Sequence, residues 1–206
     1  MIPKRLHHIW VGPKAAPKKL MNTWTAKHPD WEYVVWMDHT KTANGGKGWK
    51  NQAQIDLMPE WCGKADMMRY EILLEHGGVF MDADSRCMKP LDDRFLTPPC
   101  WACYENEKKA PGMIANGGLG AEPGSPLMKA MVDACSRAPV SQMQAWRCVG
   151  PVLLTRVAEN FPELEILPAR HLYPFHWTGA TAPGDAEIFA EQYWCGTRDT
   201  YFQYAK

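Results

Sequence analysis

One segment of twenty residues, 65–84, constrains the fold more than any other part of the chain. Apolar side chains recur at helical spacing from about residue 62 to residue 76, and the pair Gly77-Gly78 ends the pattern. The run Val79-Phe80-Met81 follows at once, and a run that is apolar at every position is typical of a short buried strand. This strand leads directly into Asp82-Ala83-Asp84. The segment therefore predicts a helix that turns sharply into a buried strand, with two carboxylates where the strand ends.

The rest of the chain also alternates between strands and helices. It opens with a strand, a helix that Pro29 ends and a second strand, which is the start of an α/β domain. No repeat, low-complexity tract or linker divides the chain, so we expect one domain over residues 1–206. Outside the segment above, the predicted strands cover residues 6–10, 31–37, 101–104, 114–120 and 164–167, and the predicted helices cover residues 16–28, 126–135 and 151–160.

The charge balance argues against nucleic acid or a membrane surface as a partner. Basic and acidic residues both total 23, so the formal net charge is zero and no overall field favours a polyanion. Residues 1–50 nevertheless carry nine Lys or Arg against three Asp or Glu, a net charge of +6. A solvated basic face is the simpler interpretation. A site for an anionic ligand near the N-terminal segment is the alternative.

The apolar stretches and the cysteines indicate a soluble protein in a reducing compartment. Lys4 and Arg5 interrupt the opening residues, so we expect no secretory signal, and the longest apolar stretches are too short to span a bilayer. The seven cysteines are irregularly spaced, which favours reduced thiols over a disulfide framework. Cys100 and Cys103 form a single Cys-x-x-Cys pair. Two half-buried strand cysteines are a simpler interpretation of this pair than a metal or redox site. We expect a cytoplasmic protein.

Four charged side chains in residues 65–84 are candidates for chemistry. Asp82 and Asp84 are two residues apart, so in an extended chain both carboxylates point to the same side and repel unless a cation lies between them. Mg²⁺ and Mn²⁺ prefer such oxygen ligands together with phosphate oxygens, whereas a surface turn with two solvated aspartates is the alternative. Asp66 and Arg69 are three residues apart and share one helix face, either as an exposed ion pair or as a buried functional pair.

The whole string resembles the DXD-containing sugar-binding glycosyltransferases, a family that includes the yeast initiating α-1,6-mannosyltransferase. The resemblance rests on Ile2 to Trp10, Ala65 to Arg69, Gly77-Gly78 and Asp82-Ala83-Asp84, which occur in the family's order and spacing. The same positions are similar to the catalytic domain of the clostridial glucosylating toxins. The resemblance implies a single GT-A domain of the α/β class, with a Rossmann-like mixed sheet flanked by helices. It also implies sugar transfer from a nucleotide-sugar with retention at the anomeric carbon.

Carried over residue by residue, the resemblance implies a donor site made of four side chains. Trp10 would stack on the nucleotide base, although a core tryptophan is the alternative. Asp66 would contact the ribose or the donor sugar, and Arg69 would hold a sugar hydroxyl or a phosphate. Asn116 would contact the donor sugar from the far side of the cleft, unless it only serves as a turn residue.

The resemblance also implies a metal site, and here the chain departs from the family. Asp84 would bind Mn²⁺ or Mg²⁺ directly, while Asp82 would contact ribose and sugar and reach the metal through water. Near the end of the chain, Gln192 replaces the family's metal-binding histidine, and Arg198 replaces a tryptophan. The Gln192 carbonyl oxygen is a weaker, neutral ligand, and His176 is the competing third ligand.

Together these features predict a metal-dependent retaining glycosyltransferase. The expected donor is a UDP- or GDP-sugar and the expected acceptor is a glycan, a polysaccharide or another hydroxyl compound, with the metal acting as Lewis acid on the leaving diphosphate. A bacterial or viral enzyme of polysaccharide biosynthesis fits this expectation. The alternatives are a nucleotide-sugar hydrolase and a sugar-nucleotide-binding module without efficient turnover. The nucleophile-elbow, Walker and dinucleotide-binding motifs do not occur in the sequence.

Overall fold

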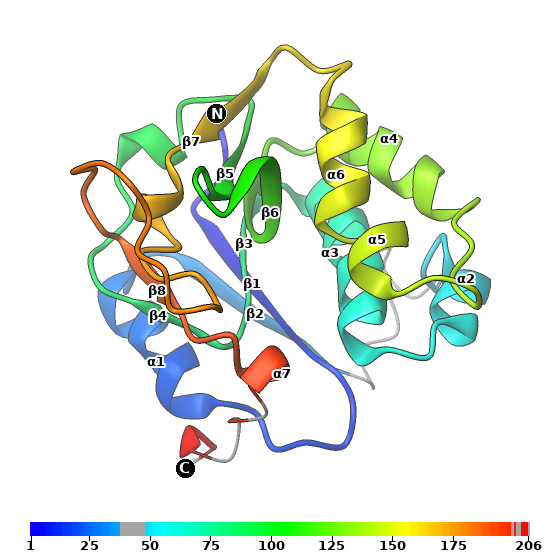
Figure 1. Cartoon of the computed structure of the whole chain (residues 1–206), viewed down its shortest axis with the longest axis horizontal. Helices are drawn as coiled ribbons and strands as arrows, with labels where there is room; N and C mark the ends of the chain where they lie inside the picture. The colour runs from blue at the N-terminus through cyan, green and yellow to red at the C-terminus, as the bar shows by residue number, and fades with distance from the viewer. Residues whose placement is uncertain (38–47, 199, 201–202, 206) are drawn as a thin grey trace.

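A computed structural model describes residues 1–37, 48–198, 200 and 203–205 of the chain. Its centre is a six-stranded sheet with the order β2-β1-β3-β6-β5-β7 (Figure 1). Only β6 runs against its two neighbours, and the other described strands of this sheet share one direction. The expected mixed α/β sheet is thus confirmed. The strands are β1 (Arg5–Trp10), β2 (Glu32–Met37), β3 (Gly78–Met81), β5 (Cys100–Asn106), β6 (Ala110–Ala121) and β7 (Leu164–Leu167).

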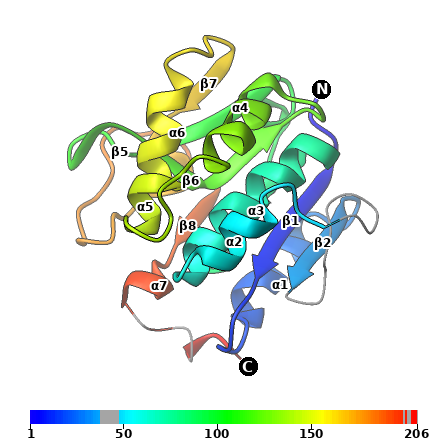
Figure 2. The ribbon, with the colours of Figure 1, turned by 90° about the vertical axis from the view of Figure 1, so that its right-hand side faces the viewer.

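Helices cover both faces of this sheet. Figure 2 shows one face covered by α2 (Gln52–Leu57), α3 (Trp61–His76), α4 (Pro126–Cys135), α5 (Ala145–Cys148) and α6 (Pro151–Ala158). The other side carries α1 (Lys18–Lys27), which packs against β4 (Ser85–Cys87) of a small ribbon formed with β8 (Ala190–Gln192). The remaining described elements are the short helix α7 (Cys195–Arg198) and two 3₁₀ turns, Asp93–Phe95 and Ala169–His171. In the part of the chain described, no helix has both the length and the apolar character needed to cross a bilayer.

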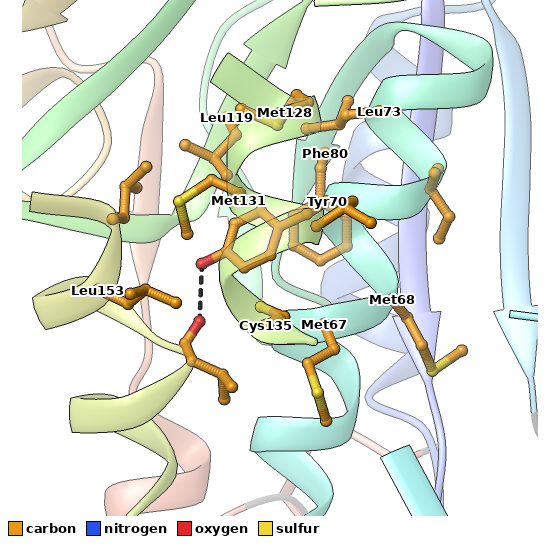
Figure 3. Packing of buried hydrophobic residues seen from close by; sticks show 14 of the residues in the cluster. Met67, Met68, Tyr70, Leu73, Phe80, Leu119, Met128, Met131, Cys135 and Leu153 are labelled. Atoms are coloured by element: carbon orange, nitrogen blue, oxygen red, sulfur yellow. Dashed lines mark hydrogen bonds between the residues drawn. The ribbon is translucent and has the colours of Figure 1, made fainter. Parts of the chain in front are cut away.

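Helix α3 is the central helix of the fold, because it is buried on nearly all sides. Its residues from Asp66 to Leu73 are all buried between the sheet and helices α4 to α6. Figure 3 shows Tyr70 in the middle of this core, with its hydroxyl donating a hydrogen bond of 3.0 Å to the Val149 carbonyl. A helix this deeply buried must pair its polar groups internally, which places Asp66 and Arg69 in a dry environment.

The turn from α3 into β3 requires glycine at two positions. Gly77 has φ +60° and Gly78 has φ +100°, which is the left-handed region that side chains with a Cβ avoid. A Cβ on Gly78 would also lie only 2.6 Å from the Arg5 carbonyl oxygen. The turn therefore brings β3 directly beside β1, where Leu6 pairs with Val79.

The structure confirms the predicted helices and strands, and it contains several shorter elements that the sequence did not predict. The helix predicted over residues 151–160 ends two residues early, at Ala158, and the other predicted helices and strands agree to within a few residues. The sequence did not indicate α2, α5, α7, β4 or β8, since elements of three to six residues show no period that distinguishes them from loops.

All seven cysteines are free thiols, as expected. Cys100 and Cys103 lie on β5 and are both fully buried, rather than half-buried as predicted, because β7 and β6 flank this strand in the middle of the core. Burial raises the pKa of the Cys100 thiol to about 11. Cys62, in the first turn of α3, is the exposed exception.

Candidate functional site

The candidate site lies at one edge of the sheet, where the parallel strands β1 and β3 both end. Trp10 is the last residue of β1, and Asp82 follows the last residue of β3. The antiparallel strand β6 reaches the same edge, because the Asp82 amide donates a 2.7 Å hydrogen bond to the Gly117 carbonyl next to Asn116. In open α/β sheets the carboxyl ends of parallel strands form the usual ligand-binding edge.

One guanidinium joins three parts of the site. Arg69 Nη2 lies 2.9 Å from Asp66 Oδ1 and 3.1 Å from Asp82 Oδ1. Its Nη1 donates to the Asn116 carbonyl, and its Cζ lies 4.4 Å from the centre of the Phe80 ring. The Arg69 side chain is only 4% exposed, whereas the Asp82 side chain is 29% exposed. Asp82 is therefore the member of this cluster that a ligand can reach.

The Asn116 side chain also points into this cluster. Its amide nitrogen donates to Asp66 Oδ1 at 2.9 Å and lies 3.2 Å from the Tyr70 hydroxyl. Asn116 belongs to β6 and is buried, so the interpretation as a turn residue was wrong. Asp66, Arg69 and Asn116, which the resemblance assigns to donor contacts, are bonded to one another in this structure.

Negative charge exceeds positive charge at the site. Among the described residues, the Arg69 guanidinium pairs with Asp66 and Asp82, whereas Asp84 accepts hydrogen bonds from the neutral Gln192 and Cys195 amides. Burial raises the pKa of Asp66 to about 7, even though Arg69 acts in the opposite direction. Burial also raises the pKa of Asp82, and burial together with the charge of Asp82 raises the pKa of Asp84. The site would thus gain from an additional positive charge.

The C-terminal part of the chain holds Asp84. Gln192 Nε2 donates to Asp84 Oδ1 at 2.8 Å, and the Cys195 amide donates to Oδ2 at 2.7 Å. The Tyr193 amide bonds the Asp84 carbonyl at 3.0 Å. Between these residues, Trp194 has φ +56°, a left-handed conformation that non-glycine residues rarely adopt.

The sequence analysis assumed an extended chain at Asp82 and Asp84, but the two aspartates lie in a turn. The Ser85 amide and hydroxyl both donate to the Asp82 carbonyl, at 3.0 and 2.6 Å, and close a turn. Asp82 consequently bonds Arg69, whereas Asp84 bonds the C-terminal segment. The carboxylates remain close enough for the charge of one to act on the other.

The structure separates the two candidates for the third metal ligand. Gln192 lies against Asp84, but through its amide nitrogen instead of its carbonyl oxygen. His176 has a partner on both ring nitrogens, with Nε2 at 2.9 Å from Glu105 and Nδ1 at 2.8 Å from the Thr178 hydroxyl. Both ring nitrogens of His176 thus have protein partners in this structure, and its role as competing ligand stays a prediction.

Trp10 is a half-buried residue and not a core residue. Its indole nitrogen donates a 2.8 Å hydrogen bond to the Lys14 carbonyl, which fixes the ring against the loop that follows β1. Stacking of Trp10 on a base stays a prediction. The side chain of Arg198 lies outside the described part of the chain.

The sequence analysis missed two residues that shape the site. A Cβ on Gly117 would overlap Asp82 Oδ2 and lie 3.2 Å from the Tyr173 hydroxyl, so only glycine lets these groups approach. Tyr173 is fully buried and its hydroxyl has no hydrogen-bond partner of normal geometry. The Asn116-Gly117-Gly118 run was the signal for Gly117, whereas nothing local distinguishes Tyr173 from a core residue.

Comparison with known proteins shows what this chain is similar to. Residues 15–99 match the family described as a glycosyltransferase sugar-binding region containing a DXD motif. Inositol phosphoceramide mannosyltransferase 3 of Schizosaccharomyces pombe is 30% identical over 135 residues, which cover 64% of this chain and 36% of that protein. The chain thus spans about a third of the length of this relative.

Two solved structures share the fold. The galactosyltransferase LgtC, described in complex with donor and acceptor sugar analogs, matches with a TM-score of 0.56 and 13% identity over 98% of this chain and 95% of its own. The PaToxG glycosyltransferase matches with a TM-score of 0.56 and 16% identity over 78% of this chain and 70% of its own. The expected GT-A fold is therefore confirmed. Residues 15–99, which contain Asp82-Ala83-Asp84, are thus similar to the glycosyltransferases whose sugar-binding region contains a DXD motif.

Proposed function

We propose that the chain is a metal-dependent retaining glycosyltransferase that moves a sugar from a nucleotide-sugar to a hydroxyl acceptor. The observation that carries the proposal is the excess of carboxylates at the carboxyl edge of the sheet, where Asp82 is partly open to solvent. The relatives and the shared fold support the reaction class. We keep the expectation of a cytoplasmic enzyme that acts on a glycan or polysaccharide as part of this proposal.

The residues present fit a divalent cation. Asp66, Asp82 and Asp84 together with Arg69 carry a formal charge of −2 when all are ionised, so a dication would bring the formal charge of the cluster to zero. Asp84 and Asp82 would hold Mn²⁺ or Mg²⁺ with the Gln192 carbonyl, which needs only an exchange of the amide oxygen and nitrogen positions. No group of three His, Cys, Asp or Glu side chains suited to a metal occurs in the described residues, so donor oxygens would complete the shell. When bound, the cation supplies Lewis-acid stabilisation of the departing diphosphate.

The chain's own residues would orient the donor. Trp10 would stack on the uracil or guanine base at the end of β1, since its ring is half-exposed there. The solvent-facing carboxylate of Asp82 would accept a hydrogen bond from a ribose or sugar hydroxyl. Arg69, held by Asp66 and Asn116, would fix Asp82 in that orientation and would not itself leave the cluster. This positioning supplies the proximity that transfer requires.

Donor binding is tested without knowledge of the acceptor. Thermal melting with UDP, GDP, UDP-glucose and GDP-mannose, each with and without Mn²⁺, should show a rise in melting temperature that needs both nucleotide and metal. Melting temperatures that ignore every nucleotide would contradict the proposal.

Retention needs a separate measurement. NMR of the first-formed product, in transfer or in donor hydrolysis, should show the anomeric configuration of the donor sugar. Inverted product would overturn this part of the proposal while leaving donor binding intact.

A sugar-nucleotide-binding module without efficient turnover is the second candidate. It is favoured by Asp84, whose two oxygens already accept hydrogen bonds from Gln192 and Cys195, and by Gln192, whose neutral amide is a weaker metal ligand than a histidine. Tight Mn²⁺-dependent nucleotide binding without hydrolysis or transfer of any donor would favour this candidate. Donor hydrolysis without transfer would instead favour a nucleotide-sugar hydrolase.

A further inference from the structure

The segment that joins β7 to β8 contains a hairpin, residues 173–182, which is orange in Figure 1. Phe175 pairs with Thr181 in an antiparallel bridge, and the His176 amide donates a 2.8 Å hydrogen bond to the Ala180 carbonyl. The hairpin is therefore an ordered feature with its own backbone pairing.

The base of the hairpin lies beside Asp82. Tyr173 is its first residue and is only 2% exposed. A Cβ on Gly117 would overlap Asp82 Oδ2 and lie 3.2 Å from the Tyr173 hydroxyl, so Gly117 has both groups close by. The charge of Asp82 also helps to raise the pKa of Tyr173. The hairpin thus starts at the accessible carboxylate of the site.

A second anchor connects the hairpin to Asp84. The indole nitrogen of Trp194 donates a 2.9 Å hydrogen bond to the Phe175 carbonyl. The next residue, Cys195, donates its amide to Asp84 Oδ2 at 2.7 Å. Two independent connections therefore fix the hairpin relative to both aspartates of the DXD motif.

The hairpin points two large aromatic side chains outward. His176 is 4% exposed and pairs with Glu105, which holds the strand from the inside. Phe175 lies in the backbone bridge and Trp177 in the turn that follows, and each side chain is 46% exposed. The Trp177 ring also lies 5.2 Å from the His176 ring, which holds it against the hairpin. Large exposed aromatic side chains on an ordered hairpin are a candidate interaction surface.

We propose that Phe175 and Trp177 form a stacking platform for a sugar ring of the acceptor. Residues 173–182 contain no Lys, Arg, Asp or Glu, so the surface suits a neutral partner and not a phosphate or an anionic lipid headgroup. A pyranose ring offers an apolar C–H face to an aromatic ring and leaves its hydroxyls free at the edge. The inference rests on the proposed function, since transfer needs an acceptor hydroxyl beside the donor, and the base of the hairpin lies beside Asp82 of the candidate donor site.

The test compares sugar binding and nucleotide binding in matched variants. Saturation-transfer NMR would be recorded with methyl α-mannopyranoside and methyl β-galactopyranoside for the wild type, Phe175→Ala, Trp177→Ala and the double variant. Trp146→Ala is the control, because Trp146 is also 46% exposed but lies on α5. We expect each single hairpin variant to weaken binding of at least one sugar about 2- to 10-fold, with a larger loss in the double variant. Mn²⁺-dependent binding of UDP or GDP and the melting temperature should stay unchanged in all of them.

Three outcomes would overturn the platform. One is equal sugar affinity in the wild type and the double variant. Another is no sugar binding by a wild type that binds UDP or GDP, which leaves the proposed function standing. The third is hairpin-dependent co-sedimentation with phosphatidylcholine vesicles without a change in sugar binding, which would assign the rings to a lipid surface. A wild type that binds neither nucleotide would instead contradict the proposed function.

Discussion

Arg69 organises the candidate site at the scale of single residues. Its guanidinium bonds Asp66 on its own helix, Asp82 after β3 and the Asn116 carbonyl on β6, and it stacks on Phe80. The resemblance assigns Arg69 to a sugar hydroxyl or a phosphate. Because both terminal nitrogens have protein partners, the structure favours a role in holding the carboxylates in place.

We therefore expect Arg69→Met to act first on stability. The change leaves the buried carboxylate of Asp66 and the partly exposed carboxylate of Asp82 without a cationic partner. Loss of one partner of a buried ion pair lowers the free energy of unfolding by about 3–5 kcal/mol. Denaturant unfolding would measure this loss. Lys129→Met is the control, because it breaks an exposed ion pair with Asp133 and should change the free energy of unfolding by less than about 0.5 kcal/mol. Equal effects of the two changes would refute the organising role.

Asp84 should act on metal binding. Asp84→Asn removes the charge of the proposed Mn²⁺ ligand but keeps an oxygen for one of its two hydrogen bonds, so we expect Mn²⁺-dependent nucleotide binding to disappear. Calorimetry with UDP and GDP would measure it, with the exposed Asp133→Asn as the control. Unchanged Mn²⁺-dependent affinity in Asp84→Asn would remove Asp84 from the metal site.

At the scale of elements, long-range pairing builds the site from short pieces. Strand β4 follows Asp84, and strand β8 begins more than a hundred residues later, yet Ser85 pairs with Gln192. This pairing delivers the Gln192 amide and the Cys195 amide to Asp84. On the opposite side, the turn from α3 to β3 fixes where Asp82 emerges from the sheet.

The turn from α3 to β3 gives a matched pair of glycine substitutions. Gly78 and Gly112 both have positive φ, but a Cβ on Gly78 would lie 2.6 Å from a backbone oxygen, whereas a Cβ on Gly112 has open space around it. Gly112→Ala should cost about 1 kcal/mol for its backbone conformation alone. Gly78→Ala should cost clearly more, about 3 kcal/mol or above, because β1 and β3 must separate. Denaturant midpoints would measure both, and equal costs would show that the sheet adapts to the added carbon.

At the scale of the whole molecule, two cores lie on opposite faces of the sheet, and buried histidines accompany them. His7 and His8 on β1 are both fully buried. The His8 ring bonds the Met81 carbonyl through Nδ1 at 2.6 Å, while its Nε2 has no partner. Burial lowers the pKa of each from 6.5 to about 4, so both stay neutral in the folded protein at neutral pH.

These histidines predict a loss of stability in acid. The unfolded chain takes up a proton on each histidine below pH 6.5, whereas the folded chain does so only near pH 4. The free energy of unfolding should therefore fall as the pH decreases through this window, by about 2 kcal/mol for each histidine at pH 5. The raised pKa of Asp66 has the opposite sign, because its protonation favours the folded state as the pH falls.

His8→Asn isolates one histidine from the other groups, since the asparagine amide can still donate to Met81 but does not titrate. Denaturant unfolding at pH 7.5 and pH 5 should show the difference between wild type and variant shift by about 2 kcal/mol in favour of the variant at the lower pH. If the difference in free energy of unfolding between wild type and variant is the same at both pH values, the pKa of His8 does not differ between the folded and the unfolded chain.

The sequence by itself determined the fold class, the long elements and the DXD edge. Helical spacing over α3, the glycine pair and the apolar β3 are local signals, because each depends on a period or a backbone conformation that neighbouring residues set. They place Asp82 and Asp84 at a strand end without knowledge of any distant contact. The spacing of Asp66 and Arg69 likewise predicts their shared helix face, which the 2.9 Å ion pair confirms.

Only the tertiary structure decided how these groups are used. Burial makes Asp66 and Arg69 a water-excluded ion pair. A turn closed by Ser85 gives Asp82 and Asp84 different bonding partners. The His176 ring bonds Glu105, a contact that the sequence does not indicate. The contact between Gln192 and Asp84 joins residues more than a hundred positions apart, and no local period encodes such a pairing. Which face of a side chain meets which neighbour depends on how distant elements pack, and that packing is a property of the whole chain.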